Sequence, residues 1–169
     1  MLASIRVVRE RFSNLRLICF GIVHPSAALP LPEGAEFSFS PTQDQIRNLY
    51  SQCDVWITAS RTEGFNLPAM EAMACRTPVV STRTGWPAEA ICPGKNGFLI
   101  DVGDANALAE CVQTVLSLSD DAWRQMSAHA HEAVARSDWE ESSDLFEKAL
   151  MHACERAFRG EISGKGKLG

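Results

Sequence analysis

The 169-residue sequence lacks any apolar run that could cross a bilayer, and it lacks an excess of basic residues. A membrane-spanning helix needs roughly 18 apolar residues in succession, which no segment provides. Lys and Arg number 16 against 21 Asp and Glu, for a net charge of −5. Because nucleic-acid surfaces depend on clustered cations, we expect no nucleic-acid partner. The first dozen residues hold arginines instead of a signal-peptide core, so a soluble, cytoplasmic protein is expected.

Cysteine pairs and other cofactor motifs are also missing. The six cysteines stand singly, with no Cys-x-x-Cys pair and no Cys/His spacing typical of zinc. His129 and His131 are two residues apart and therefore face different sides of a helix, which disfavours a shared metal. No G-x-G-x-x-G follows a predicted strand, which disfavours a dehydrogenase. We expect no metal and no other cofactor, and we expect the thiols to be reduced.

What the sequence does contain is an alternation of short β-rich runs and helical stripes. Strands are predicted at 15–21, 36–40, 54–58, 78–82 and 96–100. Helices are predicted at 2–12, 43–52, 68–75 and 85–91, followed by three more between Asp104 and Phe158. A Pro-rich irregular loop is predicted at 24–35. Strand, helix, strand at this spacing predicts an α/β fold with parallel strands and right-handed crossovers.

This alternation also bounds the domain. We expect one domain over residues 1–158 and a flexible, Gly-rich tail at 159–169. The first predicted helix has no strand before it, so we expect the sequence to belong to a larger protein.

The segment SRTEGFNLPAMEAMAC, residues 60–75, combines a strand-to-helix turn with two carboxylates. In an open parallel sheet, ligands bind at the carboxyl ends of the strands. Pro68 is predicted as the first helical residue. Glu63 precedes the turn, and Glu71 lies about one turn into the helix, with its side chain leaning back toward the helix start. Both carboxylates are therefore expected to border one cavity.

The chemistry of that cavity favours a nucleotide-sugar. A carboxylate accepts hydrogen bonds only, and a vicinal diol offers two donors. The free N–H groups and the dipole of a helix start favour a phosphate. Two other interpretations stay open: glutamates that merely complement the helix dipole on a solvated face, and the paired carboxylates of a glycoside hydrolase.

The longer segment SRTEGFNLPAMEAMACRTPVVSTRTGWPAEAI resembles the donor-binding signature of retaining glycosyltransferases of family 4, the group 1 type with the GT-B fold. That signature is a Glu, seven residues and a second Glu around E-G-F-G-L-P, which Glu63 and Glu71 reproduce. The resemblance covers roughly residues 2 to 158. It implies a Rossmann-like, three-layer α/β/α fold with a mostly parallel sheet, the C-terminal, donor-binding half of a GT-B enzyme.

The resemblance also implies site roles. Glu63 would lie against the hexose hydroxyls and is the one residue assigned to catalysis, and Glu71 would bind the ribose diol. The remaining donor-binding positions, which include backbone contacts to sugar, diphosphate and base, are Gly64, Phe65, Asn66, Leu67, Phe39 and Ser40. Trp86 is a candidate for lining the sugar pocket, although packing is the favoured role.

The sequence departs from the family in two ways. Asn66 and Arg76 stand where the family has glycine; Asn tolerates the left-handed conformation, and the Arg side chain is expected to point to solvent. The family's diphosphate-binding Arg and Lys lie upstream and have no match here, nor has the N-terminal acceptor domain. The chain alone is therefore expected to bind donor weakly and to be inactive, and any peripheral membrane association is expected only through the absent part.

The function that the resemblance implies is transfer of a hexosyl group from a nucleoside diphosphate sugar to an acceptor hydroxyl, with retention of anomeric configuration and without a metal. Two alternatives remain: a nucleotide-sugar epimerase of the same fold, and a non-catalytic binding or interaction module. The sequence names neither the donor base nor the acceptor.

Overall fold

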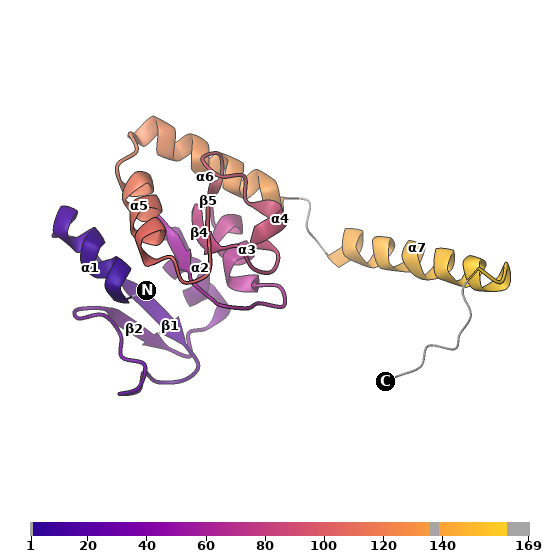
Figure 1. Ribbon diagram of the computed structural model, residues 1–169, viewed down its shortest axis with the longest axis horizontal. Helices are drawn as coiled ribbons and strands as arrows, with labels where there is room; N and C mark the ends of the chain where they lie inside the picture. Colours follow the sequence, from indigo (N-terminus) through magenta and orange to yellow (C-terminus); the bar gives the residue numbers. More distant parts are fainter. Residues whose placement is uncertain (1, 136–138, 162–169) are drawn as a thin grey trace. The chain divides into compact units, whose positions relative to one another are not determined.

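The computed structural model describes residues 2–135 and 139–161 (Figure 1). The chain forms two compact units, one up to Val134 and one from Ala135 onward. The second unit contains the helix α7 (Trp139–Phe158), which confirms the helix predicted to end at Phe158. The single domain over 1–158 stays a prediction. Most of the predicted tail, residues 162–169, lies outside the described residues.

The first unit alternates strands and helices in the predicted order. Its strands are β1 (Ile18–Gly21), β2 (Glu36–Phe39), β3 (Trp56–Thr58), β4 (Val79–Thr82) and β5 (Gly97–Ile100). Its helices are α1 (Leu2–Arg11), α2 (Gln43–Ser51), α3 (Leu67–Ala74), α4 (Pro87–Ala90), α5 (Ala105–Leu116) and α6 (Asp120–Val134). Every predicted strand and helix is confirmed, although several strands are shorter than predicted.

Local capping explains why two of these helices begin where they do. Thr42 and Gln45 form a reciprocal capping box at the start of α2, and the Asp104 carboxylate accepts the Ala107 N–H at 2.8 Å at the start of α5. Each side chain takes an N–H that the helix itself leaves unpaired. Such caps stabilise a helix by about 1 kcal/mol each.

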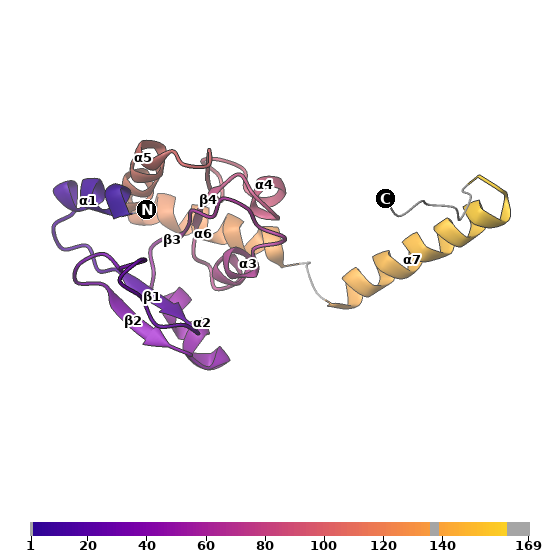
Figure 2. The same cartoon turned by 60° about the horizontal axis from the view of Figure 1, so that its bottom comes forward.

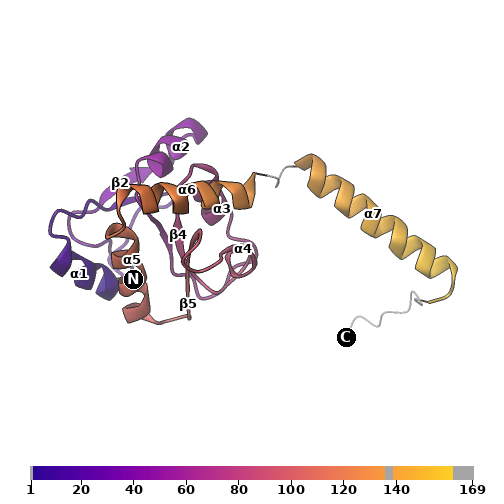
Figure 3. The same cartoon turned by 90° about the horizontal axis from the view of Figure 1, so that it is seen from above.

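All the strand pairs between named strands are parallel, as predicted for this α/β fold. The strands form two sheets: β1 pairs with β2, and β4 lies between β3 and β5. Helices cover both faces of β4 (Figures 2 and 3). Val80 is buried against α1 and α5, whereas the adjacent Val79 is buried against α2 and α3. This alternation makes the three layers, and burying each valine contributes about 1.5–3 kcal/mol.

Among the described residues, no helix has both the length and the apolar character that crossing a membrane requires.

Candidate functional site

The loops that follow β3 and β4 are held together at one edge of the sheet. Because the two strands are parallel, their carboxyl ends meet at the same edge. The Thr82 hydroxyl donates to the Ser60 carbonyl at 2.7 Å, and the Trp86 N–H donates to the Phe65 carbonyl at 2.9 Å. The loop between β3 and α3 is thus fixed against the loop between β4 and α4, which gives the candidate site a rigid base.

The turn into α3 is left-handed at Asn66, whose φ is 77°. Asn66 is buried, and its side-chain amide donates to the Thr58 hydroxyl at 3.1 Å instead of capping the helix. The prediction that this asparagine fits a left-handed turn is confirmed. The predicted helix start is off by one, because α3 begins at Leu67 and Pro68 is its second residue.

The backbone N–H groups at the mouth of α3 form no hydrogen bond with the described residues. No acceptor among the described residues takes the N–H of Gly64, Phe65, Asn66 or Leu67. Phe65 and Leu67 are 45% and 59% exposed, so the turn faces solvent. N–H groups without partners at a helix start attract an anion by hydrogen bonding and through the helix dipole.

An aromatic pair and a glycine buttress this turn. The rings of Phe65 and Trp86 stack with centroids 6.0 Å apart and 21° between their planes. Gly85 has a φ of +60°, and a Cβ there would lie 2.7 Å from the Phe65 carbonyl oxygen. Only glycine permits this approach. Trp86 therefore packs at the mouth of α3.

Glu71 is held by Tyr50, a buried residue of α2. Its carboxylate, which is half-buried, accepts the hydroxyl of Tyr50 at 3.1 Å. Burial, and then the nearby Glu71 charge, raise the pKa of Tyr50 far above its ordinary value, so the hydroxyl remains a donor. No donor in the described part of the chain bonds the second Glu71 oxygen, which is therefore available for a further donor. Tyr50 and Glu71 are 21 positions apart in the chain. The one sequence feature that points to this pair is that Tyr50 is the single tyrosine, because a tyrosine hydroxyl needs a hydrogen-bond partner when it is buried.

Glu63 lies on the other side of the turn, half-buried. Its Cβ lies close to Gly85, 3.0 Å from where a Cβ on that glycine would stand. Within the part of the chain that the structure describes, neither Glu63 nor Glu71 forms an ion pair. Neither side chain lines the cavity between β2 and α2 or the larger cavity beside β1 and β3. That both carboxylates border one ligand cavity stays a prediction.

Phe39 and Ser40, predicted beside the base, lie at the carboxyl end of β2. Phe39 is 51% exposed and stacks on His24 with centroids 4.0 Å apart and 8° between the rings. Ser40 has a φ of 46°, and its N–H donates to the Gly21 carbonyl at 2.9 Å. Only the carbonyl and side chain of Ser40 are therefore left for a ligand, and the role of both residues stays a prediction.

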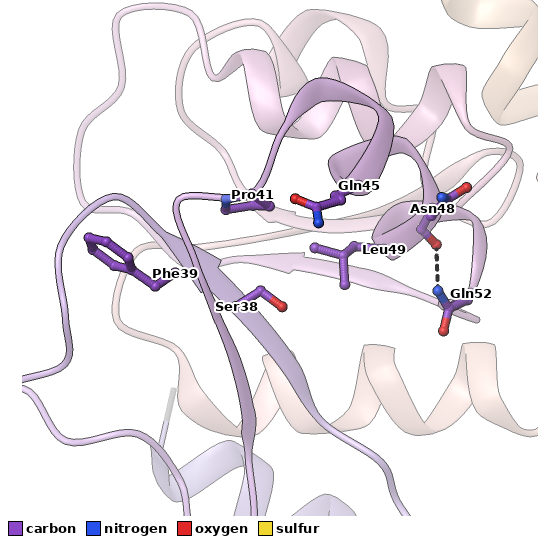
Figure 4. Close-up of a pocket in the computed structure, with 7 residues that line it drawn as sticks. All are labelled: Ser38, Phe39, Pro41, Gln45, Asn48, Leu49 and Gln52. Carbon is purple, nitrogen blue, oxygen red and sulfur yellow. Dashed lines mark hydrogen bonds between the residues drawn. The ribbon is translucent and has the colours of Figure 1, made fainter.

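A cavity of about 410 Å³ lies beside them, between β2 and α2 (Figure 4). Its lining is Ser38, Phe39, Pro41, Gln45, Asn48, Leu49 and Gln52. No charged side chain is among them. The Gln45 amide oxygen accepts the Thr42 N–H, and the Gln52 amide donates to the Asn48 carbonyl. Because two of its three side-chain amides, those of Gln45 and Gln52, already bond within the helix and its cap, we assign this cavity no ligand.

The other end of α3 is closed. Arg76 is exposed, as expected, and left-handed, with a φ of 66°. Its N–H donates to the Met73 carbonyl at 3.0 Å and the Thr77 N–H donates to the Ala72 carbonyl at 2.9 Å, which is a Schellman motif. The Ser127 hydroxyl donates to the Arg76 carbonyl at 2.6 Å. Arg76 occupies the position of this motif that favours glycine.

Within residues 2–135 and 139–161, no group of three or more His, Cys, Asp and Glu side chains is arranged to hold a metal ion.

The comparisons with known proteins agree with this arrangement. The family model described as glycosyl transferases group 1 matches residues 1–133. The chain belongs to this family. A D-inositol 3-phosphate glycosyltransferase from Corynebacterium jeikeium is 33% identical to it over 123 residues, which cover 73% of this chain and 29% of that protein.

Two solved structures show the same fold. The C-terminal domain of a group 1 family protein (LpcC) from Francisella tularensis aligns with a TM-score of 0.67 at 22% identity, over 79% of this chain and 75% of that one. Anabaena HepE in complex with UDP-glucose aligns with a TM-score of 0.65 at 18% identity, over 89% of this chain and 53% of that one. The chain is thus a GT-B-type Rossmann-like α/β structure, and it spans about 29% of the first curated relative.

Proposed function

We propose that this chain binds the nucleoside diphosphate sugar donor of a retaining hexosyltransferase. The observation that carries the proposal is the mouth of α3, where the N–H groups of residues 64–67 have no partner among the described residues. Glu63 precedes this turn in the chain, and Glu71 follows it. The N–H groups take the diphosphate, Glu71 takes the ribose diol, and Glu63 takes the hexose hydroxyls. The glycosyltransferase relatives and the UDP-glucose complex of HepE support this assignment.

The transfer step in the whole enzyme needs no nucleophile from this chain. The bond between the anomeric carbon and the diphosphate oxygen breaks, and its electron pair goes to that oxygen. The acceptor oxygen bonds the same face of the anomeric carbon, and its proton moves to the leaving phosphate. Partnerless N–H groups at a helix start stabilise the departing charge, and Glu63 positions the sugar.

Binding to the chain alone is expected to be weak. Two carboxylates lie beside a ligand that carries two phosphate charges, and the helix mouth supplies partial charges only. We expect a Kd for UDP-glucose in the millimolar range, about −4 kcal/mol, and no turnover. Micromolar affinity in isothermal titration with UDP- or GDP-sugars would contradict this expectation.

The diol contact gives the sharpest test. NMR titration with UDP and with 2′-deoxy-UDP separates the ribose diol from the diphosphate. Glu71→Gln is expected to weaken UDP about tenfold, the loss of one hydrogen bond to a charged group, and to leave 2′-deoxy-UDP nearly unchanged. Glu110→Gln on the exposed face of α5 is the matched control. Equal loss for both nucleotides would contradict the role of Glu71.

The two alternatives are separated in a full-length protein. Glu63→Ala is expected to abolish hexosyl transfer and to leave the melting temperature unchanged. An epimerase would instead interconvert the donor sugar without an acceptor, and a non-catalytic module would show no transfer in either form.

A further inference from the structure

Tyr50, the buried tyrosine of α2, is held from several sides. Only 1% of this residue is exposed, and its ring meets the rings of Phe20 and Trp56 edge-on, with centroids 5.5 and 5.0 Å away. Its backbone carbonyl accepts the hydroxyl of Thr77 at 2.8 Å, in the segment that follows α3. Because packing fixes the ring and this hydrogen bond ties α2 to the end of α3, the tyrosine hydroxyl has a set position relative to α3.

The acceptor of the Tyr50 hydroxyl is the carboxylate of Glu71. The hydroxyl donates to one oxygen, Oε2, at 3.1 Å. An ionised carboxylate only accepts hydrogen bonds, so the tyrosine must be the donor. Burial, followed by the charge of Glu71, raises the pKa of Tyr50, which keeps the proton on the hydroxyl and leaves the direction of the bond unchanged.

This bond restrains a side chain that would otherwise be free. A glutamate on a helix normally points into water, where its torsions are unrestricted. Glu71 is half-buried on α3, and no ion pair holds it within the described residues. Among those residues, the Tyr50 hydroxyl is the side-chain donor that the structure records for Glu71. The orientation of the carboxylate therefore depends on Tyr50.

A carboxylate that is already oriented loses less freedom when a ligand binds to it. The bond from Tyr50 engages Oε2 and leaves Oε1 to accept hydroxyls of a ligand. Without the tyrosine hydroxyl, the Glu71 charge would remain, but the side chain would rotate freely. A diol contact made by Glu71 would then weaken. Contacts to the N–H groups of residues 64–67 would not, because the backbone sets their geometry.

We propose that Tyr50 is a positioning residue, which orients Glu71 toward the ribose diol and thereby sets the preference of the site for ribonucleotides over 2′-deoxyribonucleotides. The inference rests on the role proposed above for Glu71. Tyr50 stays buried behind the carboxylate and acts on the nucleotide only through it. A tie between α2 and α3 that served the fold alone would stabilise the protein without changing which nucleotide binds.

A double-mutant cycle tests this role. Tyr50→Phe removes the hydroxyl and keeps the ring, and Glu71→Ala removes the group that the hydroxyl would orient. The natural chain, both single variants and the double variant are titrated by NMR with UDP and with 2′-deoxy-UDP. Tyr50→Phe is expected to weaken UDP about fivefold and to leave 2′-deoxy-UDP unchanged within about twofold. In the Glu71→Ala background, Tyr50→Phe is expected to change neither affinity, because nothing is left to position.

A second readout uses the fact that Tyr50 is the single tyrosine of the chain. Fluorotyrosine incorporated during expression labels this position alone, and its fluorine NMR resonance reports the surroundings of the hydroxyl without removing it. UDP is expected to shift this resonance more than 2′-deoxy-UDP does, and Glu71→Ala is expected to abolish the difference. This measurement does not depend on the folding of Tyr50→Phe.

The outcomes separate the two roles. Equal losses for both nucleotides in Tyr50→Phe, or the same loss of UDP affinity in the Glu71→Ala background, would overturn the inference and assign Tyr50 to the fold. A selective loss in Glu71→Ala without one in Tyr50→Phe would overturn the role of Tyr50 alone. If Glu71→Ala leaves UDP binding unchanged, the proposed role of Glu71 fails, and the role of Tyr50 fails with it.

Discussion

The two ends of α3 both contain a left-handed residue that is not glycine, and they use it for opposite purposes. At the first end, Asn66 directs its side chain to Thr58, and the N–H groups of the turn have no partner in the part of the chain that the structure describes. At the second end, the backbone of Arg76 completes a Schellman motif that satisfies the helix carbonyls. A helix whose ends are both closed has nothing left to bind a ligand with. Leaving one end open is what makes α3 a candidate binding element.

The largest expected effect is at the loop that supports the open end. Gly85→Ala places a Cβ 2.7 Å from the Phe65 carbonyl oxygen at a φ of +60°. The left-handed conformation and the overlap together should lower the free energy of unfolding by about 2–4 kcal/mol. Gly94→Ala is the matched control, because Gly94 has a φ of +80° and nothing within 4 Å. Urea denaturation measures both, and equal losses would show that the contact with Phe65 is unimportant.

Replacing Asn66 with the glycine typical of the family should destabilise the protein. Asn66→Gly relieves little backbone strain and removes the buried bond to the Thr58 hydroxyl, at a net cost of about 1 kcal/mol. A double-mutant cycle with Thr58→Ala checks the cause, since the second substitution should cost less once the first is made. Additive losses would assign the effect to something other than this bond.

The same change at the closed end should have the opposite sign. Arg76 is exposed, and the hydrogen bonds of the Schellman motif come from backbone groups, so Arg76→Gly loses no side-chain hydrogen bond that the structure records. Glycine removes the left-handed penalty and should raise the free energy of unfolding by about 0.5–1 kcal/mol. Thermal unfolding measures the change. A loss of stability would mean that the Arg76 side chain contributes to the fold.

The smallest effect concerns Tyr50, which lies behind the open end. Burial, followed by the Glu71 charge and hydrogen bond, raises the pKa of Tyr50, so the folded protein holds this proton more tightly than the unfolded chain does. Burial also raises the pKa of the Cys19, Cys53 and Cys75 thiols above their ordinary value. The contribution of these groups to the free energy of unfolding is therefore fully present below their pKa values in the unfolded chain, and it declines as pH rises above about 9. Denaturation at increasing pH should show a shallower alkaline decline in Tyr50→Phe than in the natural chain.

The elements that sequence predicts well are those with local causes. Thr42 and Asp104 each accept an N–H three residues ahead, so their helix starts are visible in a short window. The turn at Asn66 was predictable because few residues tolerate a left-handed φ. Strand lengths were less well predicted: β1 begins at Ile18, although the apolar run begins at Leu15.

The rest depended on contacts between distant residues. The bond of Tyr50 to Glu71, the stacking of Phe65 on Trp86 and the contact of Gly85 with Phe65 all join different elements. A single sequence contains no record of such pairings, because each partner is chosen by the packed fold and not by its neighbours in the chain. The division into two sheets is of the same kind, since strand order is not written in any local pattern.

The stacking of Phe65 on Trp86 also gives the open end an optical property. The indole of Trp86 stacks on the ring of the exposed Phe65, and the backbone N–H of Trp86 donates to the backbone carbonyl of Phe65. A ligand that binds at residues 64–67 changes the polarity around the Trp86 indole, and the fluorescence of the indole changes with it. Subtracting the emission of a Trp86→Phe variant removes the background of the other three tryptophans. Trp86 thus serves as an intrinsic fluorescent reporter of binding at the mouth of α3.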